Sequence, residues 1–512
     1  MYHVESFSVE NFCKLLSQYC VETSTQVIET KPHIQYIAKY LQTLNVQTIV
    51  VETDYIDHDY LTGFAAYHVK CFYDYKRKCV RLHFFKEAFE QKDLAAFLRG
   101  EKENLAENLC NSYGGFMVLH PLPKSIIGRT CLATYDDDSR RHFPTAWPIR
   151  AFFCGLELSV KALPFQEQDQ VAGACATSAL WSAFHATDRL FHHRVPSPVE
   201  ITSSATLGMP VKSRVFPNKD GLTIEQMAHA IHAVGLEPYW CDLKNQKNLL
   251  EFRALVYAYL ACGIPPILVI DLTREKSEEN NRTSIGWHAV TVTGYSLLSN
   301  RSRQHKDGEF LYKSDAIDQI YVHDDQVGPH AKMVFPSSDL DSHLTTSWGL
   351  SSGYLGIRAE IVGIVFPLYN KIRIPFSQPG NDIDTFNKAL EMVGLPWLTD
   401  TLEWDIRLTQ VNCLKKEILS SKLTNPDLRE KILASPLPRF IWHATATNDS
   451  GLVADILFDA TDIDSGKYIL RIDAHDPSLR ELLAYAKLNP TTDIGKIFSE
   501  TLNKVRTSHV TD

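Results

Sequence analysis

The feature that most constrains the fold is a nearly continuous apolar run from Ala254 to Ile270. A run of this length approaches what a membrane-crossing helix needs. Gly263, Pro265 and Pro266 interrupt it, and a proline inside a helix removes a hydrogen bond and clashes with the preceding turn. The run therefore predicts a helix followed by a buried β-strand, and argues against a membrane span.

Cys175 begins an earlier segment with the periodicity of an amphipathic helix. Its apolar positions fall on one helical face: Ala176, Ala179, Leu180, Ala183 and Phe184. Gly173 permits a tight turn before the helix, which places Cys175 in the first turn. Free backbone N–H groups and the helix dipole favour an anion there. Because a thiolate is such an anion, the segment indicates a reactive cysteine.

A histidine occupies the next informative segment, Ile285 to Tyr295, which is β-branched at most positions and predicts a strand. Strand alternation places His288 on the same face as Val290 and Val292. A strand can hold an imidazole rigidly beside a helix that packs on the same sheet. His288 is therefore the predicted catalytic base.

A third segment, residues 320–325, also has strand character and ends in two carboxylates, Asp324 and Asp325. Either carboxylate is suited to orient the imidazole. The three segments together supply a nucleophile, a base, and a group that fixes the tautomer of the base.

The order Cys175, His288 and Asp324, with Gln170 shortly before the cysteine, resembles the papain-like cysteine peptidases. Within that fold it is similar to the peptidases that process bacteriocin leader sequences. The resemblance implies that Cys175 is the nucleophile, that His288 is the base, and that Asp324 orients it. It also implies that Gln170 and the Cys175 backbone N–H stabilise the oxyanion.

The likeness extends over about residues 160–370. Residues 221–237 resemble the family's helix that ends in a glycine turn, and residues 261–270 resemble its entry into the strand before the histidine. Two departures flank the nucleophile, because Ala174 and Ala176 stand where the family usually has Asp and Gly.

Two further departures leave alternatives open. Gln166 and Gln168 compete with Gln170 for the role of oxyanion donor, and the pair Asp324-Asp325 stands where the family has Asp-Pro. The resemblance favours Asp324 over Asp325 as the orienting group.

Four neighbouring side chains raise the question of a metal site: His323, Asp324, Asp325 and His330. Their spacing is not typical of zinc ligands, so surface turn chemistry is the predicted explanation. Neither a metal nor an organic cofactor is expected.

Length and composition indicate a globular chain of about three domains, since 512 residues exceed the usual 100–200 residues of one domain. A hydrophobic fraction of 44% supports sizeable cores. The formal charge of -9 argues against general affinity for nucleic acid or anionic membranes. Eleven cysteines without a Cys-x-x-Cys motif, and no visible signal peptide, predict free thiols in the cytoplasm.

The expected domains are residues 1–150, 151–370 and 371–512. The polar run 136–141 marks the first boundary, and the Pro- and Gly-bearing segment 375–380 marks the second. The predicted fold class is α+β, with a papain-like central domain whose antiparallel sheet carries the histidine and the aspartate. The two flanking domains are expected to be of α/β type.

Periodicity also predicts individual elements in the flanking regions. The expected helices are 7–19, 34–44 and 479–488, and the expected strands are 47–51, 116–119, 126–130, 440–442, 453–458 and 468–472.

A short tract, residues 73–78, combines tyrosines with basic side chains, as single-strand nucleic-acid binders do. A solvated face is the simpler interpretation for one such run in an acidic chain. A contact with a peptide or a partner protein is the intermediate hypothesis.

These observations predict a cytoplasmic, multidomain cysteine peptidase that hydrolyses a peptide or isopeptide bond in a protein or peptide substrate. Two alternatives remain: an acyl-transferring or amidase relative that uses the same thiol, and a non-catalytic papain-fold module that binds a protein. The flanking domains are expected to restrict access, recruit substrate or bind a regulatory partner.

Overall fold

The computed structural model describes residues 2–20, 24–101, 105–123, 125–135, 139–168, 174–209, 215, 221–244, 249–275, 282–298, 310–336, 342–350, 356–394, 402–420, 426–463 and 466–506. Helices and antiparallel sheets alternate along these residues, which confirms the α+β class. Gln170 and Gly173 lie outside the described residues.

The chain forms two compact units. The first comprises Met1–Asn248, Gly263–Ser296 and Asp318–Leu368, and the second comprises Leu249–Cys262, Leu297–Ile317 and Tyr369–Asp512. The boundary expected near residue 150 thus falls inside the first unit. The reason is that the strand Leu156–Ala162 packs against the sheet formed by the first 132 residues. An isolated β-bridge between Thr130 and Phe165 also joins the following segment to that sheet.

The first part of the first unit, here called the N-terminal layer, is built on a five-stranded sheet in the order β1-β2-β3-β4-β5. All four strand pairings are antiparallel, so the predicted α/β type is wrong for this region. The elements are β1 (Tyr2–Ser6), α1 (Val9–Tyr19), α2 (Thr25–Glu29), α3 (Pro32–Thr43), β2 (Thr48–Tyr55), α4 (His58–Ala66), η1 (His68–Lys70), β3 (Cys79–Phe85), α5 (Gln91–Leu98), α6 (Leu105–Asn111), β4 (Tyr113–Leu119) and β5 (Ile127–Leu132).

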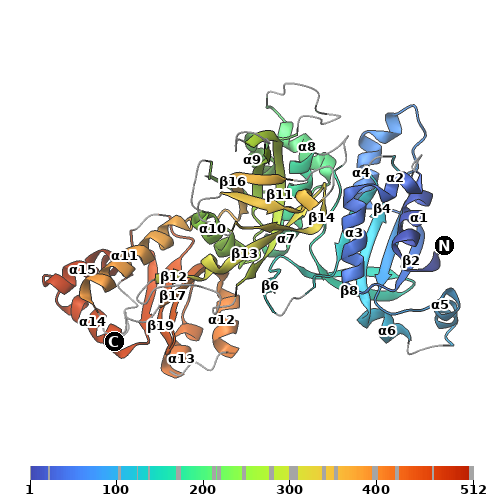
Figure 1. Cartoon of the computed structure of the whole chain (residues 1–512). Coiled ribbons are helices and arrows are strands. Elements are labelled where there is room, and N and C mark those ends of the chain that lie inside the picture. The colour runs from blue at the N-terminus through green and yellow to red at the C-terminus, as the bar shows by residue number, and fades with distance from the viewer. Residues whose placement is uncertain are drawn as a thin grey trace. The chain divides into compact units, whose positions relative to one another are not determined.

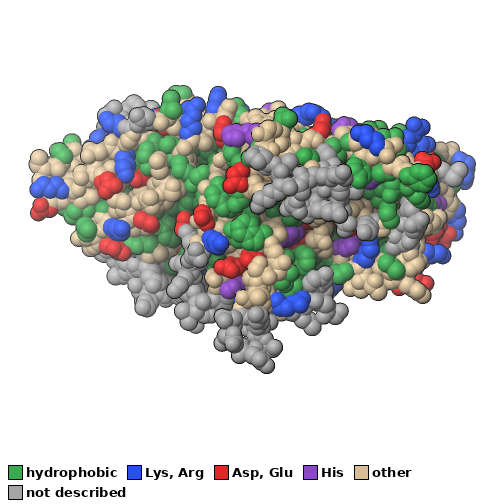
Figure 2. Space-filling model, turned by 90° about the horizontal axis from the view of Figure 1, so that it is seen from above, with side chains coloured by type: hydrophobic (Ala, Val, Ile, Leu, Met, Phe, Trp, Pro, Cys, Tyr) green, Lys and Arg blue, Asp and Glu red, His purple; other side chains and the backbone are tan. Residues whose placement is uncertain are grey.

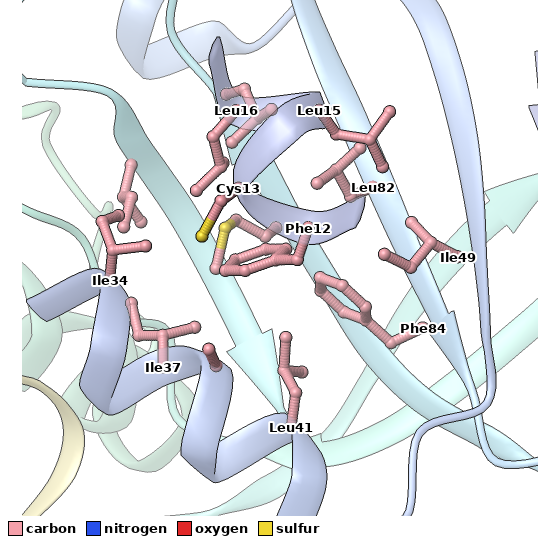
Figure 3. Close-up of a cluster of buried hydrophobic side chains, with 14 of the residues drawn as sticks. Phe12, Cys13, Leu15, Leu16, Ile34, Ile37, Leu41, Ile49, Leu82 and Phe84 are labelled. Carbon is pink, nitrogen blue, oxygen red and sulfur yellow. The ribbon is translucent and has the colours of Figure 1, made fainter. Parts of the chain in front are cut away.

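The sheet of the N-terminal layer is buried on both faces because its central strands are apolar at consecutive positions. In β2, Ile49 and Val51 face one core, whereas Val50 faces the other. The first core packs α1 and α3 on the sheet, as Figure 3 shows for ten of its side chains. A hairpin of β7 (Trp147–Phe153) and β8 (Leu156–Ala162) contributes to the second core.

Helix α1 illustrates how local sequence specifies an element of this layer. The Ser8 hydroxyl accepts a hydrogen bond from the Asn11 backbone N–H and so caps the first turn. The helix then buries Phe12 and Leu16 in the core that it shares with α3 (Figure 3), whereas Glu10, Lys14 and Gln18 are exposed.

The rest of the first unit is an eight-stranded antiparallel sheet in the order β10-β11-β13-β14-β15-β16-β9, with β6 paired to β11. Because β10 also pairs with β16, the strands from β10 to β16 close into a ring. Figure 1 labels β11, β13, β14 and β16 among these strands. The elements are β6 (Arg141–His142), α7 (Cys175–Phe191), α8 (Pro198–Thr206), α9 (Ile224–Ala233), β9 (Glu237–Asp242), β10 (Ile267–Glu275), β11 (Arg282–Leu297), β13 (Ile317–Asp324), β14 (Gly328–Val334), β15 (His343–Thr346), η4 (Ser347–Leu350) and β16 (Ile357–Leu368).

The second unit contains a five-stranded sheet, β12-β17-β18-β19-β20, which is antiparallel except for β12 beside β17. Its helices α12 and α13 pack on one apolar cluster of that sheet. The elements are α10 (Leu250–Leu260), β12 (Phe310–Tyr312), η3 (Lys313–Ala316), α11 (Ser377–Val393), β17 (Leu402–Gln410), α12 (Val411–Ser420), α13 (Pro426–Ala434), β18 (Phe440–Asn448), β19 (Gly451–Asp459), β20 (Ile469–Ala474), α14 (Pro477–Leu488) and α15 (Asp493–Asn503).

The apolar run from Ala254 to Ile270 folds as predicted, into α10 and the buried strand β10. Gly263, between them, has a φ of +84°, a conformation that favours glycine. Among the helices in the described ranges, none combines the length and the apolar content that a bilayer crossing requires.

One prediction from composition is also tested by the structure. All eleven cysteines are free thiols, which confirms that part of the prediction. Lys and Arg side chains are interspersed with Asp and Glu over the face that Figure 2 shows.

Candidate active site

Cys175 is the first residue of α7, as its sequence context predicts. Ala174, in extended conformation, precedes it, and its methyl group cannot accept a hydrogen bond from the first turn. The backbone N–H groups of the first turn therefore point toward the N-terminus of α7, where Cys175 lies, and the N-cap side chain does not accept from them. The Cys175 side chain is partly exposed, whereas the helix face that follows is buried.

Hydrogen bonds to neighbouring elements fix the position of α7. The Thr291 hydroxyl of β11 donates to the Ala179 carbonyl at 2.7 Å, one turn beyond the cysteine. The Ser182 hydroxyl donates to the Pro164 carbonyl at 2.9 Å. The strand that carries His288 therefore also holds the helix that carries Cys175.

His288 lies between the predicted nucleophile and the predicted acid. Its Nε2 atom is 3.0 Å from Asp324 Oδ1, and the Cys175 thiol is close enough to help raise the pKa of the imidazole. Because Nε2 faces the carboxylate, Nδ1 is the ring nitrogen that remains for the thiol. The structure thus brings together three of the four predicted site residues, Cys175, His288 and Asp324.

The Asp324 carboxylate is held from several sides. Trp348 donates its indole N–H to Oδ2 at 2.7 Å, and the Gln326 backbone N–H donates to Oδ1 at 3.0 Å. The Trp348 ring also meets the His288 ring edge-on, with 5.7 Å between their centroids. The indole therefore both anchors the acid and covers the imidazole, an arrangement that orients the base.

The charges of His288 and Asp324 stabilise each other. Burial is the largest single effect and lowers the pKa of His288, but the charge of Asp324, the hydrogen bond to Asp324, and the interactions with Cys175 and Asp325 together outweigh it. The pKa of His288 is therefore well above its ordinary value. Burial raises the pKa of Asp324, but the attraction of His288 and the indole hydrogen bond lower it overall. Both shifts favour an imidazolium beside a carboxylate.

Asp325 occupies a different position from Asp324. Its Oδ1 lies 3.6 Å from His288 Nε2, is buried, and has no hydrogen-bond partner among the described residues, while Oδ2 accepts from the Gln326 side chain at 2.9 Å. Burial raises the pKa of Asp325 to about 6, against the attraction of His288 and with the charge of Asp324 adding to the shift. Asp324, and not Asp325, makes the hydrogen bond to His288.

The two alternative glutamines lie on the segment that leads to α7. Gln166 is buried, and the Gln168 Oε1 atom accepts a hydrogen bond from Gln326 Nε2 at 3.2 Å. Gln168 is therefore linked to the turn that carries Asp324 and Asp325.

The N-terminal layer clamps the segment that precedes Cys175. Glu167 Oε2 accepts from the backbone N–H groups of Ile126 and Ile127 at 2.9 and 3.1 Å, and the Glu167 N–H donates to the Ile127 carbonyl at 3.0 Å. Burial raises the pKa of Glu167 to about 7, although the backbone donors oppose the shift. The Glu167 carboxyl therefore attaches the segment that precedes Cys175 to the start of β5 in the N-terminal sheet.

The same layer also braces the turn after Asp324. The Tyr36 hydroxyl of α3 donates to the Pro329 carbonyl at 3.0 Å. Gly328 adopts a φ of +146°, and a Cβ atom there would lie 2.4 Å from a carbon of the Tyr36 ring. The turn can therefore approach α3 only because residue 328 has no side chain.

The cluster that suggested a metal site is buried, so the predicted explanation as surface turn chemistry is wrong. His323 Nε2 lies 3.1 Å from the Leu163 carbonyl, and His330 Nδ1 lies 2.9 Å from the Thr293 hydroxyl. These imidazoles are buried because their strands line the interior of the first unit.

One group of described side chains has metal-ligand geometry. Donor atoms of His288, Asp324 and Asp325 lie within 4.8 Å of one another. His288 Nε2 and both oxygens of Asp324 already make hydrogen bonds, so a metal ion would have to replace these contacts. The arrangement fits an oriented imidazole better than a metal centre.

Four residues that support the site were not predicted from the sequence: Tyr36, Glu167, Gln326 and Trp348. Trp348 lies in a short 3₁₀ segment far along the chain from both His288 and Asp324, and its sequence context has no distinguishing pattern. Only its contacts show its role.

Comparison of the chain with protein-family models finds no match, and comparison with curated proteins finds none either.

Proposed function

We propose that this chain is a cysteine peptidase, with a papain-like arrangement of its central part, that hydrolyses a peptide or isopeptide bond. The observation that carries the proposal is the His288 imidazole, which is hydrogen-bonded to Asp324 and lies beside Cys175, with the partly exposed thiol at a helix N-terminus. A helix packed against a closed antiparallel sheet that carries the histidine and the acid supports the papain-like comparison.

In the proposed reaction, the thiol proton resides on His288, and the Cys175 thiolate attacks the substrate carbonyl carbon. His288 then protonates the leaving amine as the C–N bond breaks, which leaves a thioester on Cys175. A water molecule gives a proton to His288 and attacks the thioester, so that a carboxylic acid leaves and the thiol is restored. Asp324 holds the imidazole in one orientation throughout.

The oxyanion would be stabilised at the N-terminus of α7. The Cys175 backbone N–H is one donor in this proposal, and the uncapped first turn adds its dipole. Gln170 remains the proposed side-chain donor. The eleven free thiols support a reducing compartment such as the cytoplasm.

The test is covalent labelling of the full chain with an epoxide-type inhibitor of papain-like enzymes, followed by peptide mapping. We expect the label on Cys175 and its loss in Cys175→Ala. Cys241→Ala is the matched control, because Cys241 is another partly exposed thiol of the first unit. Equal labelling of Cys175 and Cys241 would contradict the proposal. Product analysis with an added amine separates hydrolysis from acyl transfer.

A further inference from the structure

The N-terminal layer exposes an unusual group of apolar side chains on residues 69–78, a loop that comprises the end of η1 and the connection to β3. The exposed fractions are 58% for Val69, 109% for Phe72 and 47% for Tyr73. Large apolar side chains gathered on one loop are typical of a binding surface, whereas isolated ones need no explanation.

The same loop concentrates positive charge in an acidic chain. Residues 69–78 contain four cations and one carboxylate, a net charge of +3, while the whole chain carries -9. Lys78 pairs with Asp54 at 3.0 Å. Lys76 and Arg77 are exposed and form no ion pair within the described part of the chain. These two cations are therefore available to a ligand.

The backbone of the loop is held in place although its side chains are exposed. The Tyr60 hydroxyl donates to the Lys76 carbonyl at 2.7 Å, and the Tyr75 ring contacts the His68 ring edge-on at 5.2 Å. Asp54, the partner of Lys78, lies with a φ of +62° in a bulge of β2. A preorganised loop of this kind loses little conformational entropy on binding.

A cavity of about 590 Å³ lies beside the loop, within the usual size range of ligand pockets. Its charged lining residues include Asp54, Asp74, Lys76 and Arg77. Its apolar lining residues include Tyr19, Phe64, Tyr75, Val80, Leu119 and Pro121. The cavity thus combines apolar and charged side chains, as anchor pockets at protein interfaces do.

We propose that this cavity and the adjoining loop bind an acidic peptide segment that carries an apolar anchor residue. The anchor side chain enters the cavity, and the carboxylates of the peptide contact Lys76 and Arg77. Asp54 and Asp74 favour a peptide over nucleic acid or an anionic membrane, because they can accept hydrogen bonds from peptide N–H groups, whereas a phosphate backbone or headgroup offers them only negative charge. The site contains none of the thiol-site residues and does not depend on the proposed peptidase function.

The test uses the full chain and a fluorescein-labelled peptide of sequence Glu-Glu-Phe-Glu-Glu, with fluorescence anisotropy as the readout. We expect saturable binding that weakens as salt is added. The double variant Lys76→Glu/Arg77→Glu should weaken binding at least about tenfold, since two attractions become repulsions. The matched control Lys14→Glu/Lys388→Glu produces the same net charge at other exposed lysines and should bind like the original chain.

Three outcomes would overturn the proposal. The first is the absence of saturable peptide binding, and the second is equal weakening by the control, which would indicate a response to net charge alone. The third is tighter binding of oligothymidylate, or of phosphatidylcholine vesicles containing phosphatidylserine, than of the peptide. Thermal unfolding of each variant shows whether it is folded, and Cys175→Ala should bind the peptide unchanged.

Discussion

At the scale of single residues, two adjacent carboxylates beside one histidine have different environments. Asp324 is bonded to His288, Trp348 and the Gln326 backbone, whereas one oxygen of Asp325 has no partner among the described residues. The charge of Asp324 also does more than that of Asp325 to raise the pKa of His288. Substitution of either carboxylate should therefore have a distinct effect on the thiol.

Asp324→Asn should slow alkylation of Cys175 by iodoacetamide at pH 7 by about tenfold or more, the equivalent of about one pKa unit. The amide removes the anion that raises the pKa of His288, so less imidazolium is present to stabilise the thiolate. The alkylation rate between pH 5 and 9, measured by mass spectrometry of the Cys175 peptide, tests this. Asp325→Asn is the control and should change the rate less. An equal effect of both variants would show that proximity, and not the hydrogen bond, determines thiol reactivity.

At the scale of elements, the site depends on two attachments to the N-terminal layer. The segment before α7 is fixed to Ile126 and Ile127 through Glu167, and the turn after β13 is fixed to α3 through Tyr36. The nucleophile and the acid are therefore positioned by a layer whose own sequence shows no sign of catalysis.

Glu167→Gln should flatten the dependence of stability on pH. Burial raises the pKa of Glu167 from 4.5 to about 7, so the folded chain retains a proton that the unfolded chain releases. Stability therefore falls as pH rises through this window, and the loss is complete above it. Between acidic and alkaline pH, the free energy of unfolding of the original chain should therefore fall by up to about 3 kcal/mol more than that of the variant, at about 1.4 kcal/mol per pKa unit.

Urea unfolding at pH 4.5 and at pH 8 measures this difference. Glutamine keeps a carbonyl that can accept from Ile126 and Ile127, so the variant should remain folded. Glu107→Gln is the control, because Glu107 is exposed. A pH dependence of Glu167→Gln identical to that of the original chain would rule out this explanation.

Gly328→Ala should both destabilise the chain and slow Cys175 alkylation. The new Cβ would lie 2.4 Å from the Tyr36 ring and must displace the turn that carries Asp324. A positive φ alone costs an alanine roughly 1–2 kcal/mol. Gly235→Ala isolates that cost, because Gly235 also has a positive φ, of +84°, but has open space around its Cβ position. The test measures the Cys175 alkylation rate and the unfolding free energy of both variants. Equal alkylation rates in Gly328→Ala and Gly235→Ala would contradict the bracing role of α3.

At the scale of the whole molecule, the second unit is made of three separate stretches of the chain. Helix α10 and the segment 297–317 belong to it, although strands of the first unit flank them in sequence. Inside this unit, the Tyr257 hydroxyl donates to Asp405 at 2.8 Å, and Lys313 pairs with the same carboxylate at 2.8 Å. The second unit is therefore not a simple C-terminal appendage.

Deletion of residues 371–512 should accordingly lower the melting temperature. The deletion removes Asp405 from Tyr257 and Lys313 and exposes the buried face of α10, where Tyr259 is buried. Limited proteolysis should then cut within residues 249–262, a stretch that we expect to resist cleavage in the full chain because most of α10 is buried. A melting temperature equal to that of the full chain would show that the first unit needs nothing from the second.

Most elements could be predicted from the sequence because the patterns that specify them are local. Helices such as 34–44 and strands such as 47–51 show their buried faces in the spacing of apolar residues, and they are observed within a few residues as α3 and β2. Antiparallel pairing was predicted only for the central sheet, as part of the resemblance. As a result, the α/β type expected for the N-terminal region had to be corrected, because the direction of a pairing leaves no trace in the periodicity of a single strand.

The sequence by itself determined the helix that starts at Cys175, the strand that carries His288, and the acidic end of the strand before Gln326, since each follows from residues adjacent in the chain. Only the tertiary structure decided that Asp324 is hydrogen-bonded to the imidazole and that Trp348 anchors the Asp324 carboxylate. The attachment of the site to the N-terminal layer through Glu167 and Tyr36 was also decided only there. These contacts join segments far apart in the chain. Their geometry depends on how the sheets close and pack, which no local pattern of residues records.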